Sequence, residues 1–338
     1  YKDSPPYVNS ISKEIVNNLT FVSLVAMKDP PKAEVKQAIA KAKNAGIRIV
    51  METGDHKETA VAIAKEIGLV TNTKNSEVLT ESDLMKMSEA EFRESVNRVN
   101  IFARVTPKMK LKILTSLQAQ GEIVAMTGDG VNDAPALKKA NIGISMGVVG
   151  TDVARESSEV ILADDNFASI VSAIEEGRTV FRNVKRTSFF LVTTSVAEHT
   201  AIIGSMVIGL PLPLLPVQIL YLNLVTDTFT GVALSTEPTH EDVLVKPPRN
   251  EKERILNKDV IPFLILMVGL TVLGTLPLFY YYLPQGLDKA RTVSFVVISM
   301  FQVWNVFNMR SIKKPIFELG ILSNKWVNLS FIVSIILM

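Results

Sequence analysis

The sequence predicts an α/β domain built on a doubly wound parallel sheet, followed by an α-helical transmembrane domain. Three observations lead to this fold class. In the first half of the 338 residues, charged side chains mix with short apolar runs, whereas the second half contains long apolar stretches. Between Phe21 and Leu162, short β-rich runs alternate with helical patterns, which is typical of a parallel sheet with crossover helices. From Ser188 onward, the apolar stretches are long enough to cross a bilayer.

The α/β part alternates predicted strands with predicted helices. The strands are expected at residues 20–27, 47–51, 101–103, 123–126, 142–145 and 160–162. The helices are expected at residues 33–45, 57–67, 89–96, 107–120 and 133–139. Because the two periods alternate along the chain, the helices are expected to cross over the faces of a parallel sheet.

One helical pattern continues from Asn166 through Leu210 without a strong breaker between Gly177 and Gly204. We therefore predict a single helix that leaves the α/β domain and enters the membrane. Such a helix could transmit a shift in the α/β domain into the membrane, because coupling between distant sites requires a physical element that has two arrangements. The alternative is an ordinary linker helix.

Membrane spans are predicted at residues 188–210, 214–235, 260–283, 292–309 and 326–338. The fifth is cut off by the last residue, so we expect the chain to be truncated at its carboxy end. Basic residues gather between the second and third spans and between the fourth and fifth. They are Lys246, Arg249, Lys252, Arg254, Lys258, Arg310, Lys313, Lys314 and Lys325. Since basic loops stay cytoplasmic, we expect a multi-pass membrane protein with its α/β domain in the cytoplasm.

Composition excludes several other classes of protein. Residues 1–20 are polar and lack the apolar core of a signal peptide. The chain has no cysteine, which excludes a disulfide framework and a thiolate metal site. The net charge is +2, and the basic residues lie at membrane boundaries rather than on one continuous face. We therefore expect the lipid bilayer as a partner and no nucleic acid.

The most specific motif is the glycine-rich acidic turn TGDGVNDAP at residues 127–135, directly after a predicted strand. Open α/β sheets bind ligands at their strand tips. Asp129, Asn132 and Asp133 can present the hard oxygen ligands that Mg²⁺ prefers, while glycines such as Gly128 let phosphate approach the backbone. A simple acidic turn is the alternative for the shorter string Gly-Asp-Gly, because these residues favour turns. The whole string predicts a magnesium and phosphate site.

Two further strings lie at strand tips. METGD at residues 51–55 precedes a helix, so the donors of Thr53 and Gly54 are placed to receive a phosphoryl group. ARVTPKMK at residues 103–110 leads from a strand into a helix and offers cations, including Arg104 and Lys110, where phosphate charge needs neutralising. We interpret Lys108 as a solvated surface lysine.

Together the three strings resemble the phosphorylation domain of P-type cation-transporting ATPases, which has a haloacid-dehalogenase-like (Rossmannoid) fold. The resemblance covers nearly the whole chain. It implies that residues 1–20 are the tail of a missing nucleotide-binding domain and that residues 21–170 are the remainder of the phosphorylation domain. Residues 171–187 would form a stalk helix and residues 188–338 the transmembrane domain. MKDPP at residues 27–31 resembles the family's hinge from the nucleotide-binding domain, which would bring the substrate ATP.

The resemblance also implies roles for individual residues. Catalytic roles would fall on Thr53, Gly54, Asp55, Lys110, Asn132 and Asp133. Cofactor-binding roles would fall on Arg104 and Gly128. Mg²⁺ would be held by Asp129 and more weakly by Asp133.

In that family the phosphorylated residue is the Asp of an upstream DKTGT string, and the sequence contains no such string. An activated nucleophile must attack the γ-phosphate to form the covalent intermediate. We therefore expect ATPase activity from a complete pump that contains this chain, and none from the isolated chain.

Glu52 departs from the family's pattern, which places an apolar residue on this buried strand. Because residues alternate across a strand, Arg48 and Glu52 are expected to share a face. Our hypothesis is a structural ion pair between them, since pairing would limit the cost of burial.

Ionisable side chains within spans are costly and usually functional, which singles out Glu198 and Asp227. Asn223, Thr226 and Asp227 fall at i, i+3 and i+4 on one predicted helical face, and Ser195 lies three residues before Glu198. Carboxylates together with amide and hydroxyl oxygens suit a hard cation. The first two spans are therefore predicted to form a cation site.

PVQILYLNLVTD at residues 216–227 resembles the sixth membrane helix of calcium pumps, and the preceding span resembles the fifth. The resemblance is nearest to the reticulum-type calcium pumps and implies Ca²⁺ as the transported ion. Ser195 stands where those pumps have Asn, and Gln302 stands where they have a Glu in the eighth helix. Both are additional candidate ligands, and both departures weaken an interpretation with two calcium sites.

Calcium transport coupled to formation and hydrolysis of an aspartyl-phosphate is the leading hypothesis. A sodium or proton pump is the alternative within transport. From another class, a noncatalytic membrane protein derived from a pump stays open, while the spans exclude a soluble phosphatase of the same fold.

Overall fold

The computed structural model describes residues 20–23, 25, 30–71, 78–239, 243–249, 258–311 and 314–338, with only the backbone described at residue 259. The chain divides into two compact units, Tyr1–Lys32 and Ala33–Met338. In the first unit, described residues 20–23 and 25 form no strand, and their apolar side chains are exposed. The strand predicted at residues 20–27 is wrong for these residues, because a strand needs a neighbour and a core to receive its side chains. Residues 1–19 of the predicted tail and 27–29 of the predicted hinge lie outside the described residues.

Short parallel strands form two sheets in the second unit. The first sheet has the order β1-β3-β2, with β1 at Met51–Thr53, β3 at Ile101–Ala103 and β2 at Val78–Thr80. The second has the order β4-β5-β6, with β4 at Ala125–Gly128, β5 at Ile142–Met146 and β6 at Val160–Leu162. The predicted parallel α/β class is confirmed, but as two small sheets instead of one.

The strand ends differ from the prediction at two places. The strands predicted at residues 47–51 and 123–126 begin later, at Met51 and Ala125. Apolar periodicity continues beyond the residues that hydrogen-bond to a neighbour, so it does not define the ends. β2 was not predicted, because a run of three residues is too short for an alternation to be recognised.

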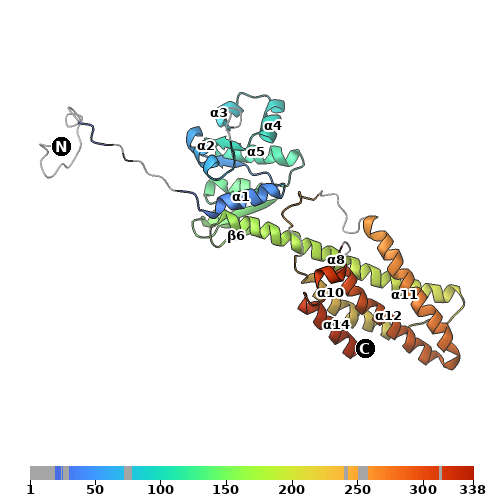
Figure 1. Cartoon of the computed structure of the whole chain (residues 1–338). Coiled ribbons are helices and arrows are strands. Elements are labelled where there is room, and N and C mark those ends of the chain that lie inside the picture. The colour runs from blue at the N-terminus through green and yellow to red at the C-terminus, as the bar shows by residue number, and fades with distance from the viewer. Residues whose placement is uncertain are drawn as a thin grey trace. The chain divides into compact units, whose positions relative to one another are not determined.

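Seven helices accompany the strands among the described residues (Figure 1). They are α1 (Glu34–Asn44), α2 (Lys57–Glu66), α3 (Glu81–Leu84), α4 (Glu89–Arg98), α5 (Pro107–Ala119), α6 (Ala134–Lys139) and α7 (Asp152–Glu156). All five predicted helices are present, whereas the short α3 and α7 were not predicted. Local capping explains two of the starts. Ser88 and Glu91 form a capping box at α4, and Thr106 caps α5 ahead of Pro107.

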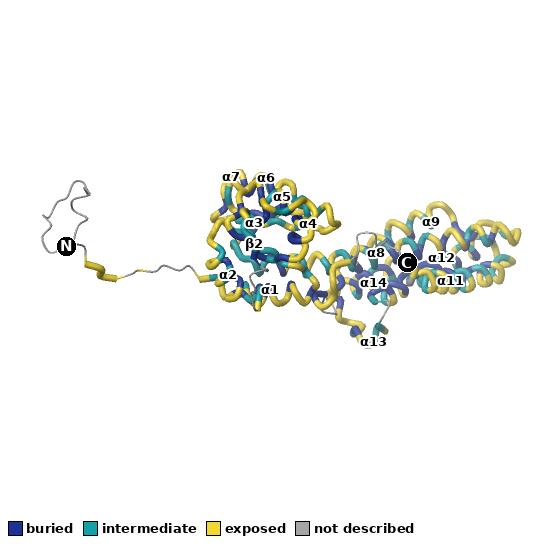
Figure 2. The backbone as a smooth tube through the Cα atoms, turned by 90° about the horizontal axis from the view of Figure 1, so that it is seen from above, coloured by how far each residue is buried: buried dark blue, intermediate teal, exposed yellow. Residues whose placement is uncertain are grey.

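The core of the α/β part lies on both sides of β3, whose three residues are fully buried. Phe102 packs with Phe92 and Ile113 in one cluster, while Ile101 and Ala103 belong to another cluster on α2 and β2. Successive side chains of a strand point to opposite faces, so β3 contributes to both clusters. Figure 2 shows buried residues inside the α/β part and within the helical bundle.

The predicted long helix is confirmed as α8 (Phe167–Val207), which has 41 residues without interruption. It starts where the side chain of Asn166 accepts a hydrogen bond from the amide of Ala168 at 3.0 Å. Arg178 on α8 donates to the carbonyl of Ala45 after α1, at 3.1 Å, and to that of Val243, at 2.8 Å. These bonds fasten the amino-terminal part of α8 to α1 and to the segment at residues 243–249.

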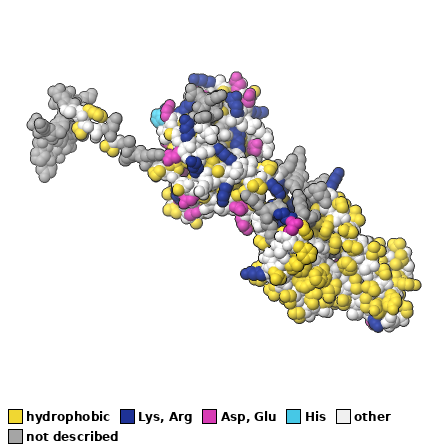
Figure 3. Space-filling view, in the orientation of Figure 1, with side chains coloured by type: hydrophobic (Ala, Val, Ile, Leu, Met, Phe, Trp, Pro, Cys, Tyr) yellow, Lys and Arg dark blue, Asp and Glu magenta, His cyan; other side chains and the backbone are white. Residues whose placement is uncertain are grey.

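The remaining helices form an apolar bundle with α8. They are α9 (Pro216–Tyr221), a π-helix (Leu222–Asp227), α10 (Thr228–Ser235), α11 (Ile261–Tyr282), α12 (Leu287–Met309), α13 (Ile316–Leu319) and α14 (Lys325–Leu337). Four segments of the described chain are long and apolar enough to cross a membrane, namely Phe167–Val207, Pro216–Ser235, Ile261–Gln285 and Leu287–Met309. The fifth predicted span is the shorter apolar helix α14. On the visible face in Figure 3, hydrophobic side chains cover this bundle and charged ones gather over the α/β part.

A buried ion pair fastens one end of the bundle. Arg310, after α12, lies 3.0 Å from both carboxylate oxygens of Glu237, after α10, and both side chains are fully buried. Asn324, the cap of α14, donates to Glu237 Oε2 at 2.7 Å, and Asn183 of α8 donates to the Glu237 carbonyl at 2.8 Å. This cluster therefore joins four helices through charge-assisted hydrogen bonds.

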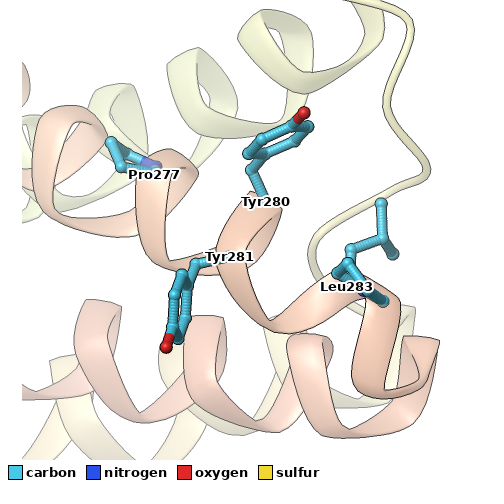
Figure 4. A pocket seen from close by; sticks show the side chains of 5 residues that line it. Pro277, Tyr280, Tyr281 and Leu283 are labelled. Atoms are coloured by element: carbon cyan, nitrogen blue, oxygen red, sulfur yellow. The ribbon is translucent and has the colours of Figure 1, made fainter.

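A pocket at the carboxyl end of α11 has a largely apolar lining. Pro277, Tyr280, Tyr281, Leu283 and Pro284 line it, and Figure 4 shows the rings of Tyr280 and Tyr281 pointing in different directions. Both tyrosines are exposed. Exposed tyrosines at the end of an apolar helix are typical of the aromatic belt at a membrane interface.

Candidate functional site

The acidic turn after β4 and the start of α5 meet at an ion pair. Lys110, on the first turn of α5, lies with its Nζ 2.8 Å from Oδ1 of Asp133, and the two side chains are only 19% and 10% exposed. The amide of Gly130 faces the other carboxylate oxygen of Asp133 at 3.4 Å. The structure thus brings together two residues, Lys110 and Asp133, that the sequence predicted for one site.

Gly128 is needed beside Asp133 for a steric reason. A Cβ atom at Gly128 would lie 2.5 Å from the Cβ of Asp133, which is far inside van der Waals contact. A larger residue at this position would displace the carboxylate from Lys110. Glycine at position 128 therefore has a steric role beside Asp133, in addition to the predicted approach of phosphate to the backbone.

The other oxygen-bearing side chains of the turn, those of Asp129 and Asn132, are exposed, while Asp133 is buried. The main-chain carbonyl of Asp129 accepts a hydrogen bond from the amide of Thr151 at 2.8 Å, which fixes the backbone below its carboxylate. An accessible carboxylate and amide beside a buried carboxylate fit the hard, oxygen-rich ligand set of Mg²⁺.

The loop after β1 is fastened to the loop after β3. The carbonyls of Thr53 and Asp55 accept hydrogen bonds from the amides of Val105 and Arg104, each at 3.1 Å. The hydroxyl of Thr53 accepts from the amide of Asp55 at 3.0 Å, so this tight turn leaves Gly54 and Asp55 exposed just before α2. Thr53 and Gly54 therefore sit at a strand tip, as the sequence predicted.

Arg104 makes a different contact from Lys110. Its backbone has φ of 54°, and its guanidinium lies 2.6 Å from Nε2 of His56 at the start of α2. The structure therefore directs Arg104 to His56 instead of the Lys110–Asp133 pair. A cofactor-binding role of Arg104 stays a prediction.

The predicted ion pair between Arg48 and Glu52 is wrong. Arg48 donates to Asn100 Oδ1 at 3.0 Å and to the carbonyls of Val96 and Val99 at 2.7 and 2.6 Å. Because β1 begins only at Met51, Arg48 is not in the strand and the alternation rule does not apply to it.

Glu52 instead lies among the charges of the candidate site. The residue is half-buried, but its Oε2 atom is fully buried and has no hydrogen-bond partner among the described residues. Burial raises the pKa of Glu52 to about 7, an effect that Lys110 opposes and Asp133 reinforces. Glu52 is therefore a second carboxyl group, beside that of Asp133, near Lys110.

In the membrane helices, Glu198 of α8 and Asp227 of the π-helix are 1% and 2% exposed. Nε2 of Gln302, on α12, donates to Oε1 of Glu198 at 2.6 Å. Oγ1 of Thr194 donates to Oδ2 of Asp227 at 2.7 Å. The predicted candidates Glu198, Asp227 and Gln302 therefore lie in one buried cluster.

Two oxygen acceptors of this cluster lack a partner. Asp227 Oδ1 and Gln302 Oε1 are buried without a hydrogen bond among the described residues. Buried polar atoms are normally satisfied, and these two oxygen acceptors fit the ligand chemistry of a hard cation. A cation would satisfy them, although the described chain contains no group of three or more His, Asp and Glu side chains placed to hold a metal ion.

Thr194 was not predicted as part of this cluster. It lies four residues before Glu198, a spacing that puts both on one face of α8. That spacing could have indicated that Thr194 belongs to the cluster. Threonines in membrane helices usually bond to their own backbone, so a threonine that also contacts a neighbouring helix is hard to recognise from sequence.

The other candidates are arranged differently. Thr226 is buried beside Asp227, whereas Asn223, at the start of the π-helix, is exposed. A ligand role of Asn223 stays a prediction. Ser195 is half-buried, and its carbonyl lies 2.6 Å from Nδ1 of His199.

Comparison with known proteins agrees with this architecture. Residues 5–141 match the haloacid dehalogenase-like hydrolase family, and residues 211–338 match the cation transporting ATPase carboxy-terminal family. "Calcium-transporting ATPase 1" of Bacillus cereus is 42% identical over an aligned length of 339 residues. The alignment covers 95% of this chain and 38% of that protein. "Calcium-transporting ATPase 1" of Saccharomyces cerevisiae is 40% identical over 321 residues, covering 94% of this chain and 34% of that protein. The chain therefore spans little more than a third of the length of these relatives.

A haloacid dehalogenase-like α/β domain is combined with four helical segments that are long and apolar enough to cross a membrane, which indicates a membrane protein. Over most of its length the chain is similar to P-type cation-transporting ATPases, and its residues 211–338 match the carboxy-terminal family of these pumps.

Proposed function

We propose that this chain forms part of an ATP-driven pump that transports calcium through formation and hydrolysis of an aspartyl-phosphate. The observation that carries the proposal is the buried cluster around Glu198 and Asp227, in which two oxygen acceptors have no hydrogen-bond partner in the described part of the chain. Such a cluster in membrane helices suits a hard cation. The relatives named calcium-transporting ATPases support Ca²⁺ as that cation.

At the phosphoryl-transfer site, the chain's own residues would position the reacting group. Thr53 and Gly54 would receive it at the tip of β1, and Lys110 would neutralise its charge from α5. Asp133 holds Lys110 in place at 2.8 Å. Bound Mg²⁺ would supply additional neutralisation of phosphate charge, held by Asp129 and supported by Asn132 and Asp133.

The nucleophile would come from the upstream part of the complete protein. Each of β1 and β4 pairs with one neighbour among the described strands, β3 and β5 respectively, so each leaves an edge. A strand that carries the DKTGT aspartate could pair at such an edge and bring its carboxylate to the strand tips. The isolated chain is therefore proposed to be inactive.

The basic loops support an orientation with the α/β domain in the cytoplasm, where ATP is available. Lys246 and Arg249 precede α11, and Lys314 and Lys325 lie between α12 and the body of α14. Positive charge of this kind favours the cytoplasmic side of a membrane.

ATP hydrolysis by the complete pump, measured with and without micromolar free calcium, tests the proposal. We expect calcium to stimulate hydrolysis, and Asp227→Asn to abolish the stimulation. Hydrolysis that ignores calcium but responds to sodium or to low pH would support a sodium or proton pump instead. Absence of hydrolysis under all these conditions would support a noncatalytic protein.

A further inference from the structure

Asp165 lies in the short connection between β6 and α8 and has an unusual conformation. Its φ is 48°, in the left-handed region that favours glycine. Its carboxylate accepts three main-chain hydrogen bonds from one loop. Oδ1 accepts from the amides of Gly147 at 2.6 Å and Val148 at 3.0 Å, and Oδ2 accepts from the amide of Val149 at 2.8 Å.

The loop that Asp165 holds, residues 147–151, follows β5 and is closely packed. A Cβ atom at Gly147 would lie 2.6 Å from the carbonyl oxygen of Leu162, and one at Gly150 would lie 1.9 Å from that of Met146. The amide of Gly147 also donates to the Leu162 carbonyl at 2.8 Å. The path of the loop is therefore fixed by backbone contacts and by the Asp165 carboxylate.

The far end of this loop reaches the candidate magnesium site. Thr151 caps α7, and its amide donates to the carbonyl oxygen of Asp129 at 2.8 Å. Asp129 is the residue predicted to bind Mg²⁺. The loop 147–151 is thus hydrogen-bonded to the Asp165 carboxylate at one end and to the backbone of Asp129 at the other.

Asp165 also immediately precedes the long helix. The next residue, Asn166, caps α8 with a 3.0 Å hydrogen bond from the amide of Ala168. The neighbouring carboxylate of Asp164 accepts from the amide of Asn166 at 3.2 Å and from the hydroxyl of Ser169 at 2.6 Å. The first turn of α8 and the 147–151 loop are thereby held by two adjacent carboxylates.

We propose that Asp165 is a positioning residue that couples the backbone of Asp129, whose carboxylate is the proposed Mg²⁺ ligand, to the start of α8. This inference rests on the proposed function, since it assigns a purpose to Asp129. A shift of the α8 amino terminus would move Asp165, and its three hydrogen bonds would carry the shift through the loop to Asp129. The element that extends into the membrane helices would then sense the state of the phosphoryl-transfer site without contacting the phosphoryl group.

The test compares Asp165→Asn with the matched control Asp164→Asn in the full chain in detergent. Asparagine tolerates the left-handed conformation, so the first variant removes charge without adding strain. For Asp165→Asn we expect hydrogen exchange to rise by about fivefold or more in peptides covering residues 147–151 and 129–133. We also expect Mg²⁺, used alone as the probe, to bind about tenfold more weakly. For Asp164→Asn we expect changes at residues 166–169 and none at residues 129–133.

Faster exchange at residues 147–151 with no change at residues 129–133 would overturn the proposal, because Asp165 would then support only its own loop. If the wild-type chain binds no Mg²⁺, the proposed function of Asp129 fails, and exchange at residues 129–133 still decides whether the link exists. If Asp165→Asn does not fold, Asp165→Gly replaces it, since glycine adopts the same φ without strain. If hydrogen exchange at residues 129–133 stayed as slow in that variant as in wild type, the link between Asp165 and Asp129 would be contradicted as well.

Discussion

Glu52 is the residue whose environment differs most from the sequence-based expectation. Burial raises its pKa from 4.5 to about 7, so the folded protein holds the proton more tightly than the unfolded chain does. Stability from this group is fully present below about pH 4.5 and is lost as the pH rises toward 7. The ionised carboxylate at high pH is the costly form.

We predict that Glu52→Gln removes this pH dependence. At pH 8 the variant should be more stable than wild type by about 1 to 2 kcal/mol, below the full value of the shift because Glu52 is only half-buried. At pH 5 the two should be nearly equal. Thermal unfolding in detergent at both pH values measures this, with the exposed Glu58→Gln on α2 as control. If the unfolding temperatures of Glu52→Gln and wild type changed with pH in the same way, the pH dependence would not come from Glu52.

Gln302 gives a second prediction at the scale of single residues. Replacing it by leucine removes the donor that lies 2.6 Å from Glu198 and one of the two orphaned acceptors. We expect Gln302→Leu to raise the free calcium concentration that half-maximally stimulates ATP hydrolysis by the complete pump about tenfold. A tenfold change corresponds to about 1.4 kcal/mol of binding free energy. The control is Ser299→Ala, one turn away on α12, whose hydroxyl bonds only to its own helix at Phe295. An unchanged calcium dependence would show that Gln302 lies outside the cation site.

Sequence reasoning located the residues of both sites better than it located their contacts. Lys110 and Asp133 are 23 residues apart, yet both follow strands, so strand-tip reasoning placed them together correctly. The contacts of Arg48 could not be predicted, because they depend on where β1 starts. The start of β1 and the π-helix at residues 222–227 are not determined by hydrophobic periodicity.

At the scale of elements, the ion pair of Arg310 and Glu237 fastens α10, α12 and α14. Both side chains are fully buried, so removing one charge takes away the opposite charge that lies 3.0 Å from the other. We expect Arg310→Met to lower the free energy of unfolding by about 3 to 5 kcal/mol. The double variant Arg310→Met with Glu237→Gln should recover part of this loss. Thermal unfolding of the four proteins of this cycle measures the coupling, and additive effects would contradict it.

Element prediction succeeded where a pattern was long and failed where it was short. α8 was predicted because the helical pattern from Asn166 through Leu210 has no strong breaker between Gly177 and Gly204. The predicted spans 214–235, 260–283 and 292–309 correspond to segments of membrane length. β2, α3 and α7 have three to five residues each and carry too little periodicity to be recognised. The separation into two sheets depends on strand pairing, which the hydrophobic pattern of a single strand does not determine.

At the scale of the whole molecule, α8 belongs to both the α/β part and the bundle. Arg178 binds the end of α1, and Glu198 lies in the membrane cluster 20 residues further along the same helix. A continuous helix can carry a displacement between the two sites only if it stays rigid.

Interrupting α8 should therefore separate phosphoenzyme formation at the α/β site from calcium uptake through the membrane helices. Val184 is 45% exposed and lies between the two ends of α8, so Val184→Pro would break the helix with little direct loss of packing. In the complete pump, we expect the variant to form phosphoenzyme from ATP but to lose calcium uptake by at least about tenfold. Val184→Ala, which keeps the helix, should behave like wild type. Normal uptake by Val184→Pro would show that the continuity of α8 is dispensable.

The most direct measurement is ATP-driven calcium uptake into sealed vesicles by the complete pump, compared with the variants Asp129→Asn and Asp227→Asn. One variant changes the phosphoryl-transfer site and the other changes the membrane cluster. If the chain carries both sites of one calcium pump, wild type accumulates calcium and each variant abolishes uptake. Uptake that continues in either variant, or no uptake by the wild type, would contradict the account.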